Sequence, residues 1–328
     1  MASKAPGKHF RKGISLPDLF RIFPDDDAAQ AWLEQQRWGG EPWCPHCGSF
    51  NVRSNRHKSM PWRCCERECR KRFSVRVGTP LYKSPLGYQT WVVAIYLLTT
   101  SLKSVSSMKL HRDLNITQKT AWFLAYRIRE AFSDKDETLF SGPVEADEAY
   151  FGGKRHNMSN TKRKELKETS AGRGSISKTP VVSVKDRATN EIRAQVVDST
   201  DAETLQGFVL SNTSIEATVY TDDAAAYDAL PRHHESVKHS VSEYVRDQAH
   251  VNGVESFWST LKRAHKGTFH KLSPKHLDRY VQEFAGRHNI RCQDTLIQMG
   301  HIVREMDGKY LPYAGLKKDT GLSSEARA

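Results

Sequence analysis

The sequence lacks long apolar runs and has few cysteines, and each shortage excludes a class of protein. Its longest apolar run, Trp91–Leu98, is far shorter than the roughly 20 residues that span a bilayer. The basic segment Met1–Phe23 has no apolar core of the kind a secretory signal needs. Five of the six cysteines lie between Cys44 and Cys69, which indicates a metal site rather than a disulfide framework. We therefore expect a globular cytoplasmic protein with no membrane association.

Positive charge is in excess, and it is unevenly distributed. Residues 1–143 contain 23 Lys+Arg and 13 Asp+Glu, whereas residues 144–328 contain 27 and 25. A basic segment favours a polyanion such as nucleic acid, or it forms an ordinary solvated surface. We expect the N-terminal part to hold nucleic acid, and the carboxylate-rich C-terminal part to have a different task.

Residues 40–78 have the cysteine pattern of a zinc ribbon. Cys44 and Cys47 form a CxxC pair, and a second cluster follows at Cys64, Cys65 and Cys69. Four thiolates suit tetrahedral Zn²⁺, and such an ion stabilises a segment too short for its own core. A strand leads into Cys64, so we expect Cys44, Cys47, Cys64 and Cys69 to bind structural zinc, with Cys65 as the alternative to Cys64. The many basic residues of this segment suit phosphate contact.

Residues 79–140 predict a helical segment. A short helix over residues 104–114, with Ser104 as its N-cap, is followed by a turn at Asn115 and by a second helix from Thr117. Basic side chains lie on the non-apolar faces of this second helix: Lys119, Arg127 and Arg129. The pattern is typical of a helix-turn-helix whose second helix enters the DNA major groove. An ordinary helical hairpin is the alternative.

From Val144 onward the pattern indicates strands that later alternate with helices. The expected strands cover 144–151, 180–185, 192–198, 217–221 and 236–241, and the expected helices cover 202–210, 224–230, 252–264 and 274–288. This order predicts an α/β sheet of the ribonuclease-H kind. In that layout the first and fourth strands are neighbours, and a late helix crosses their ends.

Three carboxylates stand out against this layout. Asp147 interrupts an apolar strand, Asp222 ends a later strand, and Glu255 lies in the first turn of the helix that begins at Asn252. Such a set can hold two Mg²⁺ or Mn²⁺ ions for phosphodiester chemistry. The alternatives are helix caps, with Asp222 before one helix and Glu255 in a capping box with Asn252. Lys262 lies on the same helix face as Glu255 and favours a phosphate substrate.

These residues lie in three blocks that resemble a known family. The blocks are Glu145–Gly153, Tyr220–Asp222 and His250–Arg263. They resemble the DDE transposases of bacterial insertion sequences, and specifically the ISXO-like group, which bears an N-terminal zinc ribbon. The resemblance extends from about Ala29 to Asn289.

The resemblance implies specific roles for the candidate residues. Asp147, Asp222 and Glu255 would be the catalytic metal ligands, and Lys262 would contact DNA near the cut. Some relatives have asparagine as the third member of the triad, so Asn252 is the alternative to Glu255. The cysteine spacing of the second zinc knuckle is also wider than the family pattern.

The implied protein is a transposase that binds terminal inverted repeats and then cleaves and joins DNA strands with two metal ions. Its partners would be double-stranded transposon ends and target DNA, and pairing two ends requires a homo-oligomer on DNA at the bacterial nucleoid. Two other classes remain: an inactive, transposase-derived, zinc-dependent DNA-binding protein, and a metal-dependent endonuclease without joining activity.

The sequence predicts a multidomain α/β protein with five parts. These are a lead-in helix and arm (1–39), the zinc ribbon (40–78), the helical DNA-binding segment (79–140), the ribonuclease-H-like DDE catalytic domain (141–310) and a tail (311–328). A basic stretch within the catalytic domain, Lys154–Gly174, is either a mobile loop that closes on DNA or a solvated insertion.

Overall fold

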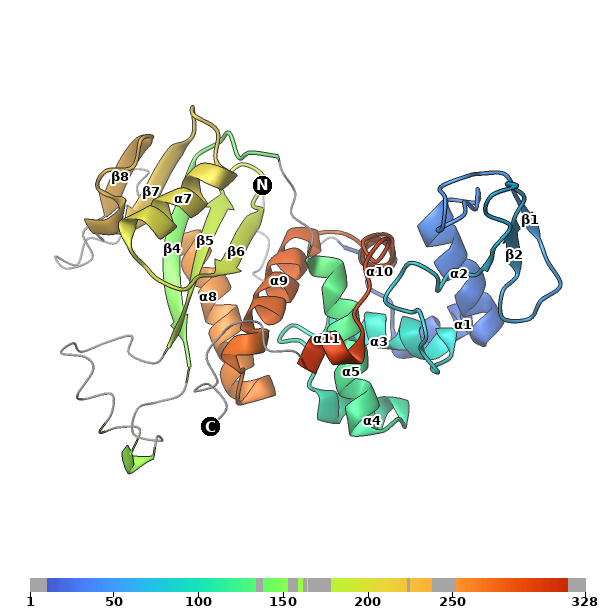
Figure 1. The fold of residues 1–328 in the computed structure, drawn as a ribbon. Helices are drawn as coiled ribbons and strands as arrows, with labels where there is room; N and C mark the ends of the chain where they lie inside the picture. Colours follow the sequence, from blue (N-terminus) through green and yellow to red (C-terminus); the bar gives the residue numbers. More distant parts are fainter. Residues whose placement is uncertain are drawn as a thin grey trace, which may run out of the picture. The chain divides into compact units, whose positions relative to one another are not determined.

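A computed structural model describes residues 11–133, 138–152, 159–161, 164, 178–222, 225–237 and 252–317. The chain forms two compact units, and within residues 11–317 its path passes from one unit to the other twice (Figure 1). Unit 1 contains residues 1–134 together with 290–318, and unit 2 contains residues 135–289 together with 319–328. Among the described helices, none is long and apolar enough to cross a membrane.

Unit 1 combines a small three-stranded sheet with helices. Its helices are α1 (Leu16–Ile22), α2 (Asp26–Trp38), α3 (Tyr88–Thr100), α4 (Ser107–Leu114), α5 (Gln118–Arg129), the 3₁₀ helix η1 (Glu130–Phe132), α10 (Thr295–Arg304) and α11 (Tyr313–Lys317). The strands β1 (Val52–Ser54), β2 (Trp62–Cys64) and β3 (Arg72–Phe73) pair antiparallel in the order β1-β2-β3. One hydrophobic core joins the sheet, α2, α3, α5 and α10.

The two-helix segment of α4 and α5 follows the sequence pattern, with one change at its start. Ser106 caps α4 by accepting a hydrogen bond from the amide of Lys109 at 3.2 Å. Ser104, the expected cap, lies in the preceding loop at a positive φ of 60°, and the helix begins after the second serine. Asn115 forms the turn at φ 50°, and Thr117 caps α5.

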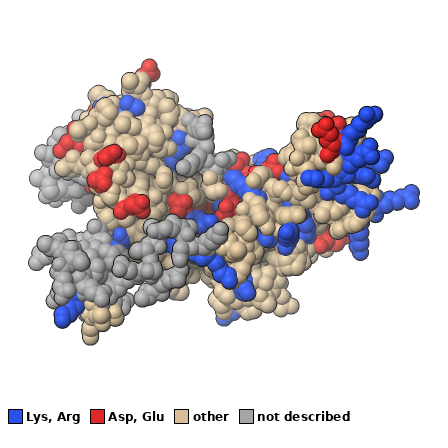
Figure 2. Space-filling model, viewed as in Figure 1, with Lys and Arg blue, Asp and Glu red and all other residues tan. Residues whose placement is uncertain are grey.

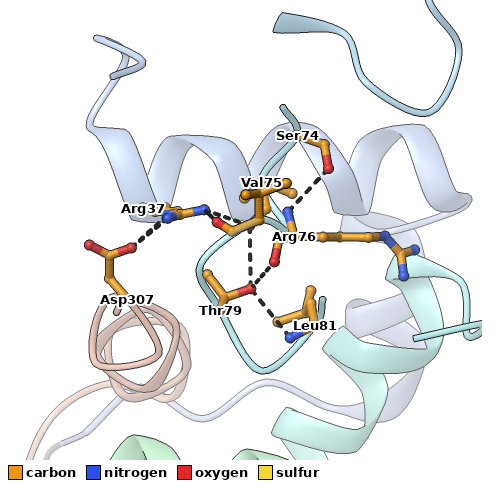
Figure 3. Close-up of polar contacts among 8 residues, drawn as sticks. Arg37, Ser74, Val75, Arg76, Thr79, Leu81 and Asp307 are labelled. Carbon is orange, nitrogen blue, oxygen red and sulfur yellow. Dashed lines mark hydrogen bonds and ion pairs between the residues drawn. The ribbon is translucent and has the colours of Figure 1, made fainter. Parts of the chain in front are cut away.

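Residues 290–317 pack in unit 1, although the sequence pattern placed residues up to 310 in the catalytic domain. The buried face of α10 supplies Met299, Ile302 and Val303 to the core that contains α2 and α3. Close by, the Arg37 guanidinium contacts Asp307 at 2.6 and 2.9 Å (Figure 3). The apolar face of α10 therefore completes a core that begins far earlier in the chain.

Unit 2 is a mixed α/β fold built on one five-stranded sheet. Its strands are β4 (Val144–Phe151), β5 (Thr179–Asp186), β6 (Ile192–Val196), β7 (Thr218–Asp222) and β8 (His233–Val237). Their order is β6-β5-β4-β7-β8; β4, β5 and β6 pair antiparallel, and β4, β7 and β8 pair parallel. The remaining elements are α7 (Ala202–Asn212), the 3₁₀ helix η3 (Ala225–Tyr227), α8 (Asn252–Ala264), the π-helix η5 (His265–Phe269) and α9 (Pro274–Ile290). The first and fourth strands of the unit are therefore neighbours.

The two faces of strand β4 have different surroundings because side chains alternate along a strand. Val144 and Ala146 join an apolar core with Leu205 and Val209 of α7. The opposite face carries Glu145 and Asp147, and both contact residues of α8. The carboxylates of this second face thus lie between the central strand and a helix (Figure 1).

Some expected elements differ or lie outside the described residues. The last strand covers His233–Val237 rather than 236–241, and residues 238–241 are not described. The helix expected at 224–230 is a 3₁₀ turn over Ala225–Tyr227. Of the basic stretch Lys154–Gly174, only residues 159–161 and 164 are described, so its expected closure on DNA remains a prediction.

Candidate active site and thiol cluster

Four cysteine side chains meet at one point of unit 1. The Sγ atoms of Cys44, Cys47, Cys64 and Cys69 all lie within 4.8 Å of one another. Cys44 and Cys69 are 3.7 Å apart, and Cys47 and Cys64 are 3.6 Å apart. Tetrahedral zinc with Zn–S bonds of about 2.3 Å requires sulfur atoms about 3.8 Å apart. The cluster therefore fits Zn²⁺ in both ligand type and spacing.

The first pair of thiols lies on a tight turn. The carbonyl of Cys44 accepts hydrogen bonds from the amides of Cys47 and Gly48, at 3.3 and 2.8 Å. Gly48 adopts a left-handed φ of 77°, which glycine reaches at little cost. This turn directs both sulfur atoms of the CxxC pair to the same side.

The second turn has the same hydrogen bonds but a different first residue. Here the carbonyl of Glu66 accepts from the amides of Cys69 and Arg70, at 3.2 and 3.1 Å. Glu66 thus occupies the position that Cys44 has in the first turn. The fourth sulfur comes from Cys64, two residues earlier at the end of β2, and this explains the wider cysteine spacing.

Cys64 and Cys65 have opposite environments. Cys64 is buried, and burial raises the pKa of its thiol to about 12. Cys65 is exposed and lies outside the cluster, while its amide donates to the carbonyl of Asn51 at 2.8 Å. The structure thus gathers the four cysteines that the strand pattern favoured.

In unit 2, two of the predicted carboxylates lie on neighbouring parallel strands. The pairing of β4 with β7 aligns Val144 with Val219 and Glu145 with Tyr220. Asp147 and Asp222 each lie two residues beyond the pair Glu145–Tyr220, so the alternation of side chains directs both to the face that carries Glu145 and Tyr220. Their closeness is also evident electrostatically, because the charge of Asp222 raises the pKa of Asp147.

Asp147 has a strongly perturbed environment. Its pKa is raised to about 7, first by burial and then by the negative charges of Asp222 and Glu148. Two donors oppose this shift: the amide of Glu148 donates to Oδ1 at 2.8 Å, and the indole of Trp258 donates to Oδ2 at 3.0 Å. Repulsion between carboxylates is relieved by a hard divalent cation, for which carboxylate oxygens are the preferred ligands.

Glu255 and Lys262 line a cavity beside Asp147. The cavity has a volume of about 460 Å³, and both side chains are exposed on α8. Its lining residues are Asp147, Glu255, Trp258, Ser259, Lys262, Arg263 and Lys266. Asp222 is half-buried and is not among them. The cavity thus combines two carboxylates with three basic side chains, as an anionic substrate and a cation would require together.

The three predicted carboxylates are not as tightly gathered as the thiols. Within the described ranges, the cysteine cluster is the group of three or more ligand atoms close enough to share an ion. Asp147 and Asp222 are neighbours across the sheet, whereas Glu255 reaches the cavity from α8. The donor set fits Mg²⁺ or Mn²⁺ by its chemistry, since it offers only hard oxygen ligands.

Glu145, another acidic residue of β4, is buried and has contacts that stabilise the fold. It is 2% exposed and pairs with Arg187 at 2.9 Å. Its Oε2 also accepts from the amide of Val254 in the first turn of α8, at 3.0 Å. A carboxylate from the sheet therefore caps this helix, where the helix dipole favours negative charge.

Three further residues line or adjoin this site, and none of them was assigned a role from the sequence. Trp258 touches Asp147, and its position three residues after Glu255 and four before Lys262 was a usable signal. Lys266 extends the basic lining of the cavity. Glu148 lies half-buried and accepts a hydrogen bond from Tyr227 at 3.1 Å, and burial together with the charge of Asp222 raises its pKa.

Basic residues that could hold nucleic acid lie mainly on the ribbon. Figure 2 shows Lys and Arg side chains gathered over the strands β1 and β2. The exposed basic residues of this ribbon surface are Arg53, Arg56, Lys58, Arg67, Arg70, Lys71 and Arg72. In α5, by contrast, Arg127 and Arg129 are 6% and 2% exposed, and Arg127 stacks on the Phe123 ring. These two arginines pack inside unit 1, and Lys119 is the exposed one of the three basic residues that the sequence pattern indicated.

Two similarities to known proteins agree with this geometry. Residues 139–289, nearly the whole described sheet unit, match the ISXO2-like transposase domain family. A protein of Halobacterium salinarum, described as an uncharacterized protein in transposable element ISH50, is 27% identical over 284 residues, which cover 82% of this chain and 93% of the relative. The sheet unit is therefore similar to a transposase domain, and most of the chain is similar to a protein of a transposable element. The match to the ISXO2-like domain agrees with the resemblance that the three sequence motifs predicted.

Proposed function

We propose that this protein is a DNA transposase that binds the ends of an insertion sequence, cleaves DNA strands there and joins them to target DNA. The observation that carries the proposal is the alignment of Asp147 and Asp222 on adjacent parallel strands, beside a cavity that Glu255 and Lys262 line. The strand order and the crossing of α8 support assignment of unit 2 to the ribonuclease-H-like catalytic domains.

Each residue of the site has a proposed role. Asp147, Asp222 and Glu255 would hold two Mg²⁺ or Mn²⁺ ions, which supply charge stabilisation and activate the attacking oxygen when bound. Lys262 would contact a phosphate of the DNA strand near the scissile bond. Glu255 is preferred to Asn252 as third member because it lines the cavity and offers a charged oxygen ligand.

Unit 1 would hold the DNA. We propose that Cys44, Cys47, Cys64 and Cys69 bind one structural Zn²⁺, which stabilises the ribbon and its basic surface. The helix pair α4 and α5 would add a second contact with the terminal inverted repeat. Double-stranded end and target DNA are the proposed partners, with a homo-oligomer pairing two ends, in the cytoplasm where the chromosome lies.

A strand-transfer assay tests the catalytic proposal. Purified protein is mixed with labelled end DNA, unlabelled target DNA and Mg²⁺, and the products are separated on a denaturing gel. We expect cleaved and joined products from the wild type, and neither from Asp147→Asn, which should still bind end DNA. Asp198→Asn is the matched control, because Asp198 is an exposed residue of the same unit; this variant should remain active.

The same assay separates the other two classes. Cleavage without joined product would identify a metal-dependent endonuclease. Binding without either reaction would identify an inactive DNA-binding protein and overturn the catalytic proposal. Strand transfer retained in Asp147→Asn would refute the metal role of that residue.

Salt dependence of binding tests the role of the ribbon surface. The binding constant for DNA falls as salt rises, and each neutralised phosphate makes the slope of log K against log salt steeper by about 0.9. We therefore expect the slope of Arg67→Gln/Arg72→Gln to be shallower than that of the wild type by up to about 1.8, in fluorescence-anisotropy titrations with end DNA. Arg21→Gln removes an exposed charge from α1 and serves as the control. An unchanged slope in the double variant would place the phosphate-binding residues elsewhere.

A further inference from the structure

Strand β4 and helix α8 contact each other in a regular pattern. Glu145, Asp147 and Phe151 all project from the same face of the strand, because they are separated by even numbers of residues. Glu145 accepts a hydrogen bond from the amide of Val254, and one turn later Trp258 contacts both Asp147 and Phe151. The helix is thereby held on the strand that carries the first catalytic aspartate.

The Trp258 side chain is almost fully enclosed at this contact. The residue is 3% exposed, and its ring packs against Phe151 and Phe257, with centroid distances of 6.2 and 5.0 Å. Its polar atom, Nε1, lies 3.0 Å from Oδ2 of Asp147. The packing therefore fixes the orientation of the indole ring, and this orientation sets the direction of the hydrogen bond that Nε1 donates to Asp147.

The second oxygen of Asp147 is also oriented. The amide of Glu148 donates to Oδ1 at 2.8 Å. A carboxylate oxygen has two acceptor sites, so one hydrogen bond on each oxygen leaves acceptor capacity for a cation. An indole N–H is a donor that cannot accept, so Trp258 cannot itself replace Asp147 as a ligand.

From this contact we propose that Trp258 is a positioning residue that orients the Asp147 carboxylate for divalent metal binding. The inference rests on the proposed function, because it concerns the metal site of the same reaction. Outer groups that hydrogen-bond to a metal ligand fix its orientation, and removing one weakens metal affinity or activity by about 10–100-fold. Trp258 also lies three residues after Glu255 and four before Lys262, on the face of α8 that lines the cavity.

The variant Trp258→Phe keeps a buried aromatic ring and removes the N–H donor. Mn²⁺ binding to the DNA-free protein is measured by electron paramagnetic resonance, and Mn²⁺ dependence is measured in the strand-transfer assay. We expect a dissociation constant for Mn²⁺ at least about tenfold higher, and partial rescue of strand transfer at high Mn²⁺. Binding of end DNA should not change.

Trp91→Phe is the matched control. Trp91 is a fully buried tryptophan of unit 1 whose indole donates to Ser84 at 3.1 Å. This variant removes the same kind of hydrogen bond away from the metal site, so its Mn²⁺ affinity should equal that of the wild type.

The outcomes distinguish this inference from the function on which it rests. A wild type that neither binds Mn²⁺ nor cleaves DNA would overturn the proposed function itself. A wild type that does both, with an unchanged Mn²⁺ affinity in Trp258→Phe, would overturn the role of Trp258 alone. Equal reductions in Trp258→Phe and Trp91→Phe would show general destabilisation and would also count against it.

A measurement on the unaltered protein applies if Trp258→Phe does not fold. The indole ¹⁵N–¹H resonance of Trp258 is assigned through its proximity to the Phe151 ring, and Mg²⁺ is titrated into the wild type and into Asp147→Asn. We expect the resonance to shift in the wild type and to stay in place in Asp147→Asn. Saturable Mg²⁺ binding without a shift in the wild type would overturn the inference.

Discussion

The two adjacent cysteines of the second knuckle allow a sharp test of the zinc ribbon. Cys64→Ser replaces a buried thiol of the cluster, and Cys65→Ser replaces an exposed thiol one residue away. Both variants make the same chemical change in the same segment. They differ only in whether the sulfur that is removed belongs to the four-sulfur cluster.

The size of the expected effect follows from the number of ligands. Structural zinc binds cysteine-rich sites with roughly 10–16 kcal/mol. Divided evenly over four sulfur ligands, this corresponds to about a hundredfold to thousandfold weaker zinc binding per ligand removed. We therefore expect Cys64→Ser to lose zinc to a moderate chelator, whereas Cys65→Ser should keep wild-type affinity.

The assay is zinc content by mass spectrometry, combined with competition against a chromogenic chelator. Near-ultraviolet circular dichroism of Trp62, which lies two residues before Cys64 on β2, reports whether the ribbon unfolds when the metal is removed. Full zinc content in Cys64→Ser, or zinc loss in Cys65→Ser, would refute the ligand assignment. Full zinc content in Cys44→Ser/Cys69→Ser would refute the whole site.

Two further predictions concern stability. In Gly253→Ala the new Cβ would lie 2.7 Å from Oε2 of Glu145, so we expect about 1–3 kcal/mol of destabilisation in urea unfolding. The control is Gly267→Ala, which has open space at its Cβ and should leave the stability nearly unchanged. Equal destabilisation in the two variants would contradict the close approach at Gly253. The Arg37 side chain is 1% exposed, pairs with Asp307 and donates to the carbonyls of Val75 and Val77 (Figure 3). The variant Arg37→Met removes all of these interactions. We expect about 3 kcal/mol of destabilisation of unit 1 by urea unfolding with tryptophan fluorescence, and an unchanged midpoint would show that this pair contributes little.

Local patterns in the sequence were sufficient for most elements. The alternation in Val144–Phe151 predicted β4 with its observed ends, and the helix over residues 252–264 was also predicted at its observed ends. These elements have a single strong periodicity and clear boundaries. Their side-chain directions follow from that periodicity, and Asp147 lies on the face of β4 opposite to Val144 and Ala146.

Tertiary burial was not readable from the same patterns. Arg127 and Arg129 look like solvent-facing charges on α5, yet both are buried. An arginine can be enclosed where aromatic rings stack on its guanidinium, as Phe123 does for Arg127 at 4.2 Å, and its sequence neighbours do not reveal this. The cap of α4 was missed for a smaller reason, since serines at positions 104, 106 and 107 can each start a helix, and it is Ser106 whose side chain accepts from the amide of Lys109.

The candidate active site was predicted as residue types rather than as contacts. Spacing in the sequence selected Asp147, Asp222, Glu255 and Lys262, and strand adjacency explains the first two. The contact of Trp258 with Asp147 and that of Val254 with Glu145 depend on how α8 packs on β4. This packing joins residues more than 100 positions apart in the sequence. Such pairs become visible only when strand and helix are placed together.

Unit 1 is formed by two segments that are far apart in the sequence, and this affects the order in which the protein can fold. A ribosome completes the ribbon and α3 long before it adds Met299, Ile302 and Val303, which belong to the same core. All of residues 135–289 of unit 2 are synthesised in between. Contacts so distant in sequence form slowly because a long loop must close first. In the nascent chain, the apolar face of residues 1–134 therefore stays uncovered until α10 is synthesised.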